Sequence, residues 1–370
     1  MRPMGGDQVR EAVGHASAFL RTAVGRDWAG TKAGGLTWSC RETAEHVAGC
    51  LLAYASQLAG RATEGYVPFD LALDDDADNA GLVDVVETTG ALLTAVLRTT
   101  PAGVRAFHPA PFRSAGREGF AAMGVTEVLL HTHDIAQGLG LPYEPPAELC
   151  VDVLARLFPH VRPDEEPWPT LLWATGRGDL PDRTPLTEWR WFNPLVIPAE
   201  RLELHAVTPA AAADLAAGGT GGFEWLGGGP AEGTRVGAGL VFTAYQAGAL
   251  HPEWGTFALV RTEDGRALGA LGFHSAPDED GHVEIGYDLV EAARGHGYAT
   301  EAVRALADWA GRRARETGDV RRLWAVVDTS NTASQRVVER SGFRRVDEEG
   351  EQFAYELRLP QGAEAAAEAD

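Results

Sequence analysis

The stretch from Val283 to Ala302, VEIGYDLVEAARGHGYATEA, decides the fold assignment for the second half of the chain. It predicts an apolar strand, a short irregular link, a glycine-bearing loop over residues 294–299 and a helix that begins near Thr300. The free N–H groups and the positive dipole end of such a helix attract an anion. Gly295 and Gly297 carry no Cβ, so a ligand can come close to the backbone. We therefore predict a phosphate site whose natural guest is a pyrophosphate.

At these residues the chain resembles the GNAT superfamily of acyl-CoA N-acyltransferases, and within it the RimJ/RimL-like branch. The family loop is Gln/Arg-x-x-Gly-x-Gly/Ala, and Arg294, Gly297 and Ala299 match it. Residues 284–287 resemble the family's fourth strand, and residues 331–343 resemble its Asn-x-x-Ser…Gly-Phe segment. Over residues 196–360 the resemblance implies an α/β GNAT fold with a mixed, mostly antiparallel sheet that binds acetyl-CoA.

The resemblance also implies which residues bind the cofactor and which catalyse transfer. The expected cofactor-binding residues are Leu289, Val290, Arg294, Gly295, His296, Gly297, Tyr298, Ala299, Thr300 and Asn331. An amine must lose a proton to attack a thioester, which requires a base. Glu284, on the strand beside the acetyl group, is the first candidate, and His274, at the end of the preceding strand, is the second. Each could instead be an ordinary strand residue.

The departing thiolate needs a proton donor, unless it leaves unaided. Many family members carry a tyrosine four residues before the glycine of the Gly-Phe motif, but this chain has Val338 there. We take Ser334 as the substitute. Simple capping of the following helix is the alternative role for Ser334 and Asn331.

Length and composition set further limits. A chain of 370 residues suggests two domains, and 45% hydrophobic residues allow full-sized cores. The net charge of −21 argues against nucleic acid or an anionic membrane as a partner. We see no apolar run long enough to span a bilayer and no signal peptide, and three cysteines without scaffold spacing. A cytoplasmic location is expected.

The first half, residues 1–195, predicts several helices and a trailing linker. Asp7 is expected to cap the first helix, and the S-x-x-E pattern at Ser39 predicts a capping box for the second. Further helical patterns cover residues 82–97, 120–139 and 148–157, followed by a Pro- and Trp-rich flap and linker over residues 159–198. Antiparallel helices of this length pack as a bundle. Residues 361–370 are expected to be a disordered tail.

The fourth helical pattern brings Glu127 and His131 onto one face, because they are four residues apart. Together with His46 on the second pattern they form a plausible three-ligand set for Zn²⁺ or a similar divalent ion. Three protein ligands would leave positions open for water or substrate. The plainer alternatives are a surface Glu–His pair and a buried histidine in the core.

Residues 37–48 resemble the second-helix motif of the DinB-like superfamily, and more closely the N-terminal domain of mycothiol-dependent maleylpyruvate isomerases. The resemblance implies an all-α four-helix bundle with His46, Glu127 and His131 as metal ligands. Asp134 fits the family's His-x-x-Asp pattern and would hold His131 from outside the ligand set. In that superfamily the metal activates a small thiol, so a low-molecular-weight thiol is a candidate partner.

Taken together, the sequence predicts a cytoplasmic two-domain enzyme that transfers acetyl from acetyl-CoA to an amine, either a small molecule or a protein N-terminus. The glycine-rich segment 218–239 would wall the acceptor site, with Glu224 as a possible ammonium contact. Three alternatives stay open. The metal domain could carry the main activity as a thiol-dependent transferase or isomerase, the acetyl-CoA fold could be a non-catalytic sensor, or the protein could inactivate an aminated antibiotic.

Overall fold

The computed structural model describes residues 1–101, 103–109, 114–186, 188–189 and 191–360. It divides into two compact units, Met1–Asn193 and Pro194–Asp370. Each unit buries apolar clusters of its own, two in the first and one in the second. The predicted tail, residues 361–370, lies outside the described residues.

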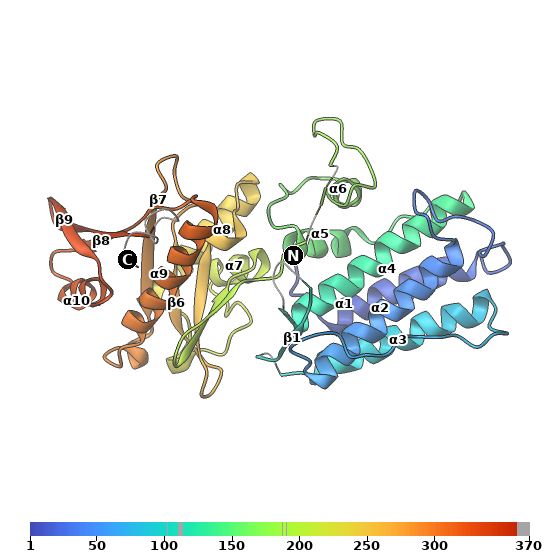
Figure 1. Cartoon of the computed structure of the whole chain (residues 1–370), viewed down its shortest axis with the longest axis horizontal. Helices are drawn as coiled ribbons and strands as arrows, with labels where there is room; N and C mark the ends of the chain where they lie inside the picture. Colours follow the sequence, from blue (N-terminus) through green and yellow to red (C-terminus); the bar gives the residue numbers. More distant parts are fainter. Residues whose placement is uncertain (102, 110–113, 187, 190, 361–370) are drawn as a thin grey trace, which may run out of the picture. The chain divides into compact units, whose positions relative to one another are not determined.

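The first unit is built mainly from helices. Four long ones pack against one another, and Figure 1 shows them running side by side. Its elements are α1 (Gly6–Arg21), α2 (Cys40–Gly60), α3 (Asn79–Thr99), the short strands β1 (Arg105–Phe107) and β2 (Ser114–Gly116), α4 (Arg117–Leu139), α5 (Ala147–Leu157) and α6 (Pro167–Ala174). Helix α4 is buried over most of its length, so it forms the centre of this unit. The DinB-like assignment of this unit stays a prediction.

Local chemistry explains where these helices begin. The predicted capping box is confirmed: the Ser39 hydroxyl accepts from the Glu42 N–H (3.1 Å), and the Glu42 carboxylate accepts from the Ser39 N–H (2.7 Å). The prediction for the first helix was wrong. Asp7 lies inside the first turn, where it pairs with Arg10 and Arg98, and Gly5 is the cap residue.

Two further predictions for this unit need correction. We predicted no apolar run long enough to span a bilayer, but helix α3 is long and apolar enough to do so by length and composition alone. Its apolar side packs against α1 and α2, and a bundle helix meets the same criterion. The segment predicted as flap and linker contains helix α6, which starts at Pro167, where the fixed φ of proline favours a first turn.

The second unit is an eight-stranded sheet with helices on its faces. Strand order is β3-β4-β5-β6-β7-β8-β10-β9, antiparallel except between β7 and β8. Its elements are β3 (Val196–Pro198), β4 (Leu202–Ala206), α7 (Pro209–Ala216), α8 (Glu232–Ala247), β5 (Thr256–Arg261), β6 (Ala267–Phe273), β7 (His282–Leu289), α9 (Tyr298–Thr317), β8 (Arg322–Asp328), α10 (Thr332–Arg340), β9 (Arg344–Glu349) and β10 (Gln352–Arg358). This mixed, mostly antiparallel sheet fits the predicted GNAT fold.

The two faces of the sheet have different partners. Val283, Ile285 and Leu289 of β7 are buried in the cluster that contains the apolar side of α9. Alternate residues of a strand point to opposite faces, so Glu284 and Asp288 belong to the other face. Helix α8 packs on that face against β5, β6 and β7.

Helix α8 falls partly within the glycine-rich segment that was predicted as an acceptor-site wall. Two of its glycines have a packing role. A Cβ at Gly233 would come within 2.8 Å of Asp288, and one at Gly237 within 3.1 Å of Thr256. Packing against the sheet therefore outweighs the low helix propensity of glycine here.

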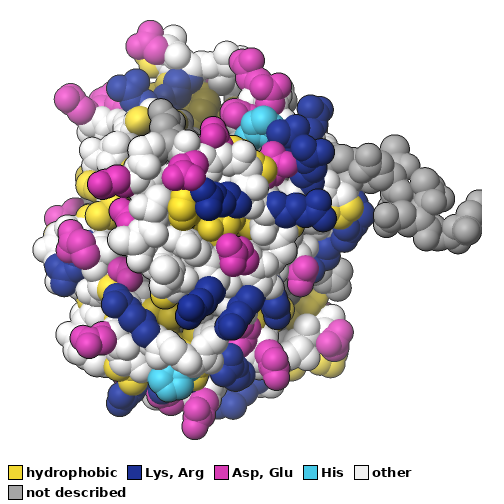
Figure 2. All heavy atoms as spheres, turned by 90° about the vertical axis from the view of Figure 1, so that its left-hand side faces the viewer, with side chains coloured by type: hydrophobic (Ala, Val, Ile, Leu, Met, Phe, Trp, Pro, Cys, Tyr) yellow, Lys and Arg dark blue, Asp and Glu magenta, His cyan; other side chains and the backbone are white. Residues whose placement is uncertain are grey.

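The surface at the β9 end of the second unit mixes charges of both signs. Figure 2, which views the molecule from that end, shows arginine side chains interspersed with carboxylates and only small apolar areas between them. The chain has far fewer basic than acidic residues, so this gathering of arginines is a local feature.

Candidate functional site

The predicted phosphate loop links the end of β7 to the start of α9. Gly295 and Gly297 adopt left-handed backbone conformations, with φ of +79° and +83°. Residues other than glycine rarely adopt these angles, so the backbone shape alone favours glycine at both positions. Gly297 is the cap residue of α9, a helix of 20 residues, and the N–H groups of its first turn have no partners within the helix. The loop therefore fits an anionic group such as a pyrophosphate.

The residues before the loop are already engaged in the sheet. The Val290 N–H donates to the Leu268 carbonyl (2.9 Å), so it is not free for a ligand. The Leu289 carbonyl accepts from Arg294 Nε (3.1 Å). Arg294 therefore ties the loop to the end of β7. Its guanidinium lies 3.7 Å from the Asp288 carboxylate.

Arg201, just before β4, fixes the start of α9. Its N–H and its Nε donate to the two carboxylate oxygens of Glu301 at 2.5 and 2.8 Å. Its Nη1 donates to the His296 carbonyl (3.2 Å), and its guanidinium lies 4.6 Å from the Tyr298 ring centre. The loop is thus held in shape by contacts from the turn between β3 and β4.

Glu284 and His274 face each other on neighbouring strands. His274 Nδ1 lies 3.4 Å from Glu284 Oε1, and the two side chains are 46% and 39% exposed. The hydrogen bond with Glu284 raises the pKa of His274. A Cβ at position 286 would lie 2.7 Å from His274 Nε2, so Gly286 leaves the room in which the imidazole lies. The two predicted bases therefore form one pair.

Asn331 and Ser334 lie at the start of α10. The Asn331 side chain accepts from the Ser334 N–H (3.0 Å), which is the capping role that the sequence left open for Asn331. The Ser334 carbonyl accepts from the Tyr287 hydroxyl (3.2 Å). Val338 is fully buried, so the position of the family's tyrosine belongs to the core here.

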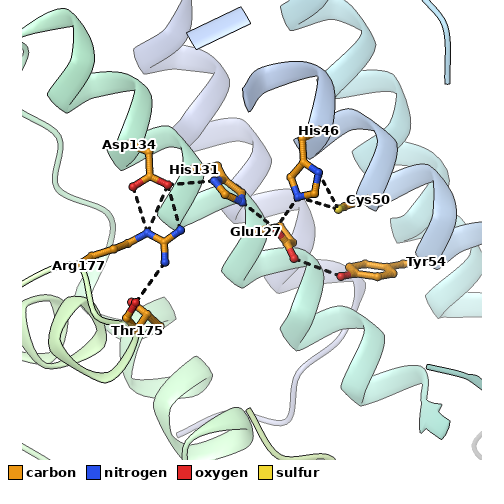
Figure 3. Close-up of polar contacts among 8 residues, drawn as sticks. All are labelled: His46, Cys50, Tyr54, Glu127, His131, Asp134, Thr175 and Arg177. Carbon is orange, nitrogen blue, oxygen red and sulfur yellow. Dashed lines mark hydrogen bonds and ion pairs between the residues drawn. The ribbon is translucent and has the colours of Figure 1, made fainter. Parts of the chain in front are cut away.

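The three predicted metal ligands of the first unit come together, two from α4 and one from α2 (Figure 3). Glu127 Oε2 lies 3.1 Å from His131 Nε2 and 3.5 Å from His46 Nε2. One ligand atom from each residue lies within 4.8 Å of the others. Two ligands of one tetrahedral Zn²⁺ stand about 3.4 Å apart, given bonds of ~2.0–2.1 Å. Two nitrogens and a carboxylate oxygen at these separations fit such an ion.

The ionisation of the triad reflects burial and pairing. Burial alone raises the pKa of Glu127, but hydrogen bonds from His131 and His46 outweigh it and lower the pKa to about 2. Burial alone lowers the pKa of His131, but Asp134 and Glu127 raise it to about 9. A cation that bound here would therefore replace a proton on His131.

Asp134 orients His131 for this role. His131 Nδ1 lies 3.0 Å from Asp134 Oδ2, so an Nδ1–H donates to the carboxylate, and Nε2 faces the triad as the ligand atom once it has lost its proton. Asp134 also accepts from Arg177 Nε and Nη2 at 3.0 Å (Figure 3). Both histidine orientation and carboxylate charge are thus fixed by contacts beyond the triad.

Sequence reasoning missed several neighbours of the two sites. Cys50 Sγ lies 3.4 Å from His46 Nε2, and the Tyr54 hydroxyl donates to Glu127 Oε1 at 3.3 Å. Both follow His46 on α2 at helical spacing, a signal that was present in the sequence. Arg177 reaches Asp134 from a separate segment, and nothing in its local sequence marked it. Tyr287 lies on β7, within the predicted strand, but its contact with Ser334 depends on the packing of α10.

Comparison with known proteins agrees with the fold of the second unit. Residues 201–344 match the model of the acetyltransferase (GNAT) domain. The second unit therefore carries a GNAT acetyltransferase domain. The matched range contains the glycine loop, Glu284, His274 and α10.

Two curated relatives match a shorter part of the chain. An uncharacterized N-acetyltransferase, YjdG, of Bacillus subtilis is 35% identical over 88 residues, which are 24% of this chain and 50% of that protein. An uncharacterized N-acetyltransferase, p20, of Bacillus licheniformis is 30% identical over 97 residues, which are 26% of this chain and 52% of that protein. The chain thus spans about half the length of these relatives.

Solved structures with similar folds include two acetyltransferases. RimL, a ribosomal alpha-N-protein acetyltransferase in complex with coenzyme A, is 20% identical, with a TM-score of 0.33 over 45% of this chain and 98% of that one. A GNAT-family acetyltransferase from Bacillus anthracis is 18% identical, with a TM-score of 0.30 over 44% of this chain and 98% of that one.

Proposed function

We propose that the second unit is an N-acetyltransferase that moves an acetyl group from acetyl-CoA to an amine. The observation that carries this proposal is a single strand, β7, which presents Glu284 and leads into the glycine loop at α9. The Glu284 carboxylate, which would accept the proton, and the anion site for acetyl-CoA thus lie on one continuous segment. The match of residues 201–344 to the GNAT domain supports the same assignment.

The loop binds the donor through its backbone. The first-turn N–H groups of α9 and the helix dipole attract the pyrophosphate of acetyl-CoA. Gly295 and Gly297 allow the turn, and Arg201 holds Tyr298 and Glu301 in place. Anion binding here does not depend on a lysine, which this region lacks, since Lys32 is the one lysine of the chain.

The Glu284–His274 pair removes the proton. As the amine nitrogen bonds to the thioester carbonyl carbon, an N–H proton passes to Glu284, directly or through water, and the carbon–sulfur bond breaks. His274 holds the carboxylate in place at 3.4 Å. His274 is thereby a positioning residue in this scheme, and Glu284 is the catalytic one.

The thiolate that departs takes a proton from a neighbouring group or from water. Burial raises the pKa of Tyr287, so its phenol stays protonated at neutral pH. Its hydroxyl lies between β7 and α10, at the Ser334 carbonyl. Ser334 stays the proposed donor, because the cap and this contact use its backbone atoms and not its hydroxyl.

Measuring free thiol released from acetyl-CoA against a panel of amines and peptide N-termini tests the proposal. Release that depends on one class of amine is the expected result. Tight acetyl-CoA binding by calorimetry without any release would identify a sensor and overturn the proposed catalysis.

For the first unit we propose a divalent-metal site, probed with Zn²⁺, held by His46, Glu127 and His131. The convergence of three ligand atoms and the fixed orientation of His131 support it. When bound, such an ion would supply Lewis acidity and could lower the pKa of a coordinated thiol or water. A low-molecular-weight thiol is the partner that the DinB-like resemblance suggests. Thiol-dependent turnover that requires the metal would make this unit a second enzyme.

A further inference from the structure

Four neighbouring strands place a row of side chains on the face of the sheet that carries Glu284. The His274 N–H donates to the Glu284 carbonyl (3.0 Å), Glu284 is paired with Trp324 of β8, and Trp324 is paired with Glu356 of β10. Directly paired residues of neighbouring strands point to the same face. Trp324 therefore stands next to the proposed base.

In the described part of the chain, the helices with the main contacts to β8 lie on the other face of the sheet. Helix α8 packs on β5, β6 and β7, whereas α10 packs on β8 and β9. The buried residues of β8, Leu323, Ala325 and Val327, belong to the cluster shared with α9 and α10, so α10 and α9 lie on the opposite face. Trp324 is half-buried, and Val326, two residues further along the same face, is 38% exposed. An apolar platform thus borders Glu284.

The charges beyond Trp324 favour one class of amine over another. Glu356 is bonded by Arg358 Nε (2.6 Å) and lies 3.1 Å from Arg322 Nη1, and Arg344 is its pairing partner on β9. Two guanidinium groups thus bond one carboxylate, and a third arginine stands at the paired position on β9. Figure 2 shows arginines at this end of the unit, interspersed with carboxylates. A second or third positive charge on the acceptor would be repelled here.

We propose that Trp324 is a specificity-determining residue and that the acceptor is a monoamine with an apolar group beside its nitrogen, not a polycation. This inference rests on the proposed acetyl transfer. The amine nitrogen lies toward Glu284, and the adjacent apolar group covers the indole ring. An indole offers a large, rigid contact surface at little conformational cost.

The test uses the full chain with acetyl-CoA and compares phenylethylamine with spermidine. Wild-type protein should acetylate phenylethylamine with the higher kcat/KM. Trp324→Ala should raise KM for phenylethylamine ~10-fold, as expected for the loss of one apolar contact surface, with kcat changed less than about twofold. Trp324→Phe should restore most of the affinity. Trp189→Ala, at an exposed tryptophan of the first unit, is the matched control and should change nothing.

Titrating the same amines by calorimetry into protein saturated with CoA separates this inference from the proposed function. If phenylethylamine binds, Trp324→Ala weakens it and no acetyl is transferred, the docking surface stands and the catalytic proposal fails. If acetyl is transferred and Trp324→Ala leaves KM unchanged while acetyl-CoA affinity shows an intact fold, the docking surface is overturned. A wild-type preference for spermidine would overturn it as well.

Discussion

At the scale of single residues, the assignment of Glu284 as the base makes a kinetic prediction. Glu284→Gln should lower kcat by ~10²–10³-fold, since general bases contribute on that order, while acetyl-CoA affinity stays at the wild-type value. Glu263→Gln, in the exposed turn between β5 and β6, is the matched control. Steady-state kinetics and calorimetry together check both statements. Wild-type kcat in the Glu284 variant would remove this residue from the mechanism.

His274 gives the reaction a pH dependence. The hydrogen bond with Glu284 raises its pKa above the ordinary value, so the imidazolium persists to higher pH in the folded protein. As pH rises through that pKa the imidazolium is lost, and the Glu284 carboxylate no longer has a cation that competes with the amine proton, so kcat/KM should increase. His274→Asn should abolish this inflection. A pH profile with the same inflection in the variant would assign the titration to another group.

The metal triad predicts that substitution of one histidine removes the bound metal and substitution of a neighbouring histidine does not. His131→Ala should reduce bound Zn²⁺ from about one ion per chain to near zero, because two remaining ligands do not hold a tetrahedral ion tightly. His133→Ala is the matched control, since His133 lies on the same helix but packs against Trp168 at 5.3 Å between ring centres. Metal analysis after dialysis measures both variants. Full metal content in His131→Ala would refute the triad, and acetyl-CoA affinity should be unchanged throughout.

At the scale of elements, the loop before α9 can be tested through its backbone. Gly297→Val should abolish acetyl-CoA binding, because the side chain fills the anion site and the left-handed conformation costs more than ~1–2 kcal/mol for a branched residue. Gly318 closes the same helix with φ of +69°. Gly318→Val has a similar free-energy cost for its left-handed backbone but lies at the other end of the helix. It should therefore lower Tm without affecting acetyl-CoA binding. Equal loss of binding in both variants would show that strain, not the site, is responsible.

Several elements could be predicted because local chemistry decides them. The Ser39 capping box and the glycine loop depend on neighbouring residues alone. The capping box is found where the sequence put it, and so is the loop, although α9 begins at Tyr298 rather than near Thr300. Helix α8 could not be predicted in the same way. Its Gly233 and Gly237 weaken a helix locally and are needed only because the sheet lies so close. Helix α6 was missed because tryptophan and proline gave its segment no helical period.

In the candidate sites, too, the features set by local sequence could be predicted and those set by distant segments could not. Spacing four residues apart brought Glu127 and His131 together, since both lie on one helix. Spacing could not predict the contact of Arg177 with Asp134, because the two residues are 43 positions apart in the sequence. The Glu284–His274 pair needed the register between β6 and β7, and the row through Trp324 needed two further registers. Strand register between distant segments is a property of the packed sheet.

At the scale of the whole molecule, each unit has its own core, which predicts that the units fold separately. Residues 1–193 and 194–370 expressed as two chains should each give a cooperative thermal transition. The first should retain the Zn²⁺ site and the second the affinity for acetyl-CoA. Circular dichroism and calorimetry on both fragments measure this. A fragment that aggregates or loses its ligand would show that the two units depend on each other.

The contacts from Arg201 to Glu301 and His296 have a consequence for motion. Because these bonds tie the first turn of α9 to the turn between β3 and β4, the first turn needs no ligand to become ordered. Amide hydrogen exchange at Glu301, whose N–H donates to the Gly297 carbonyl, should already be slow in the empty protein, whereas the free N–H groups before it should become protected only when the nucleotide binds. The CoA product could then dissociate without the unfolding of any segment. Its dissociation rate would depend only on the strength of its contacts with the protein.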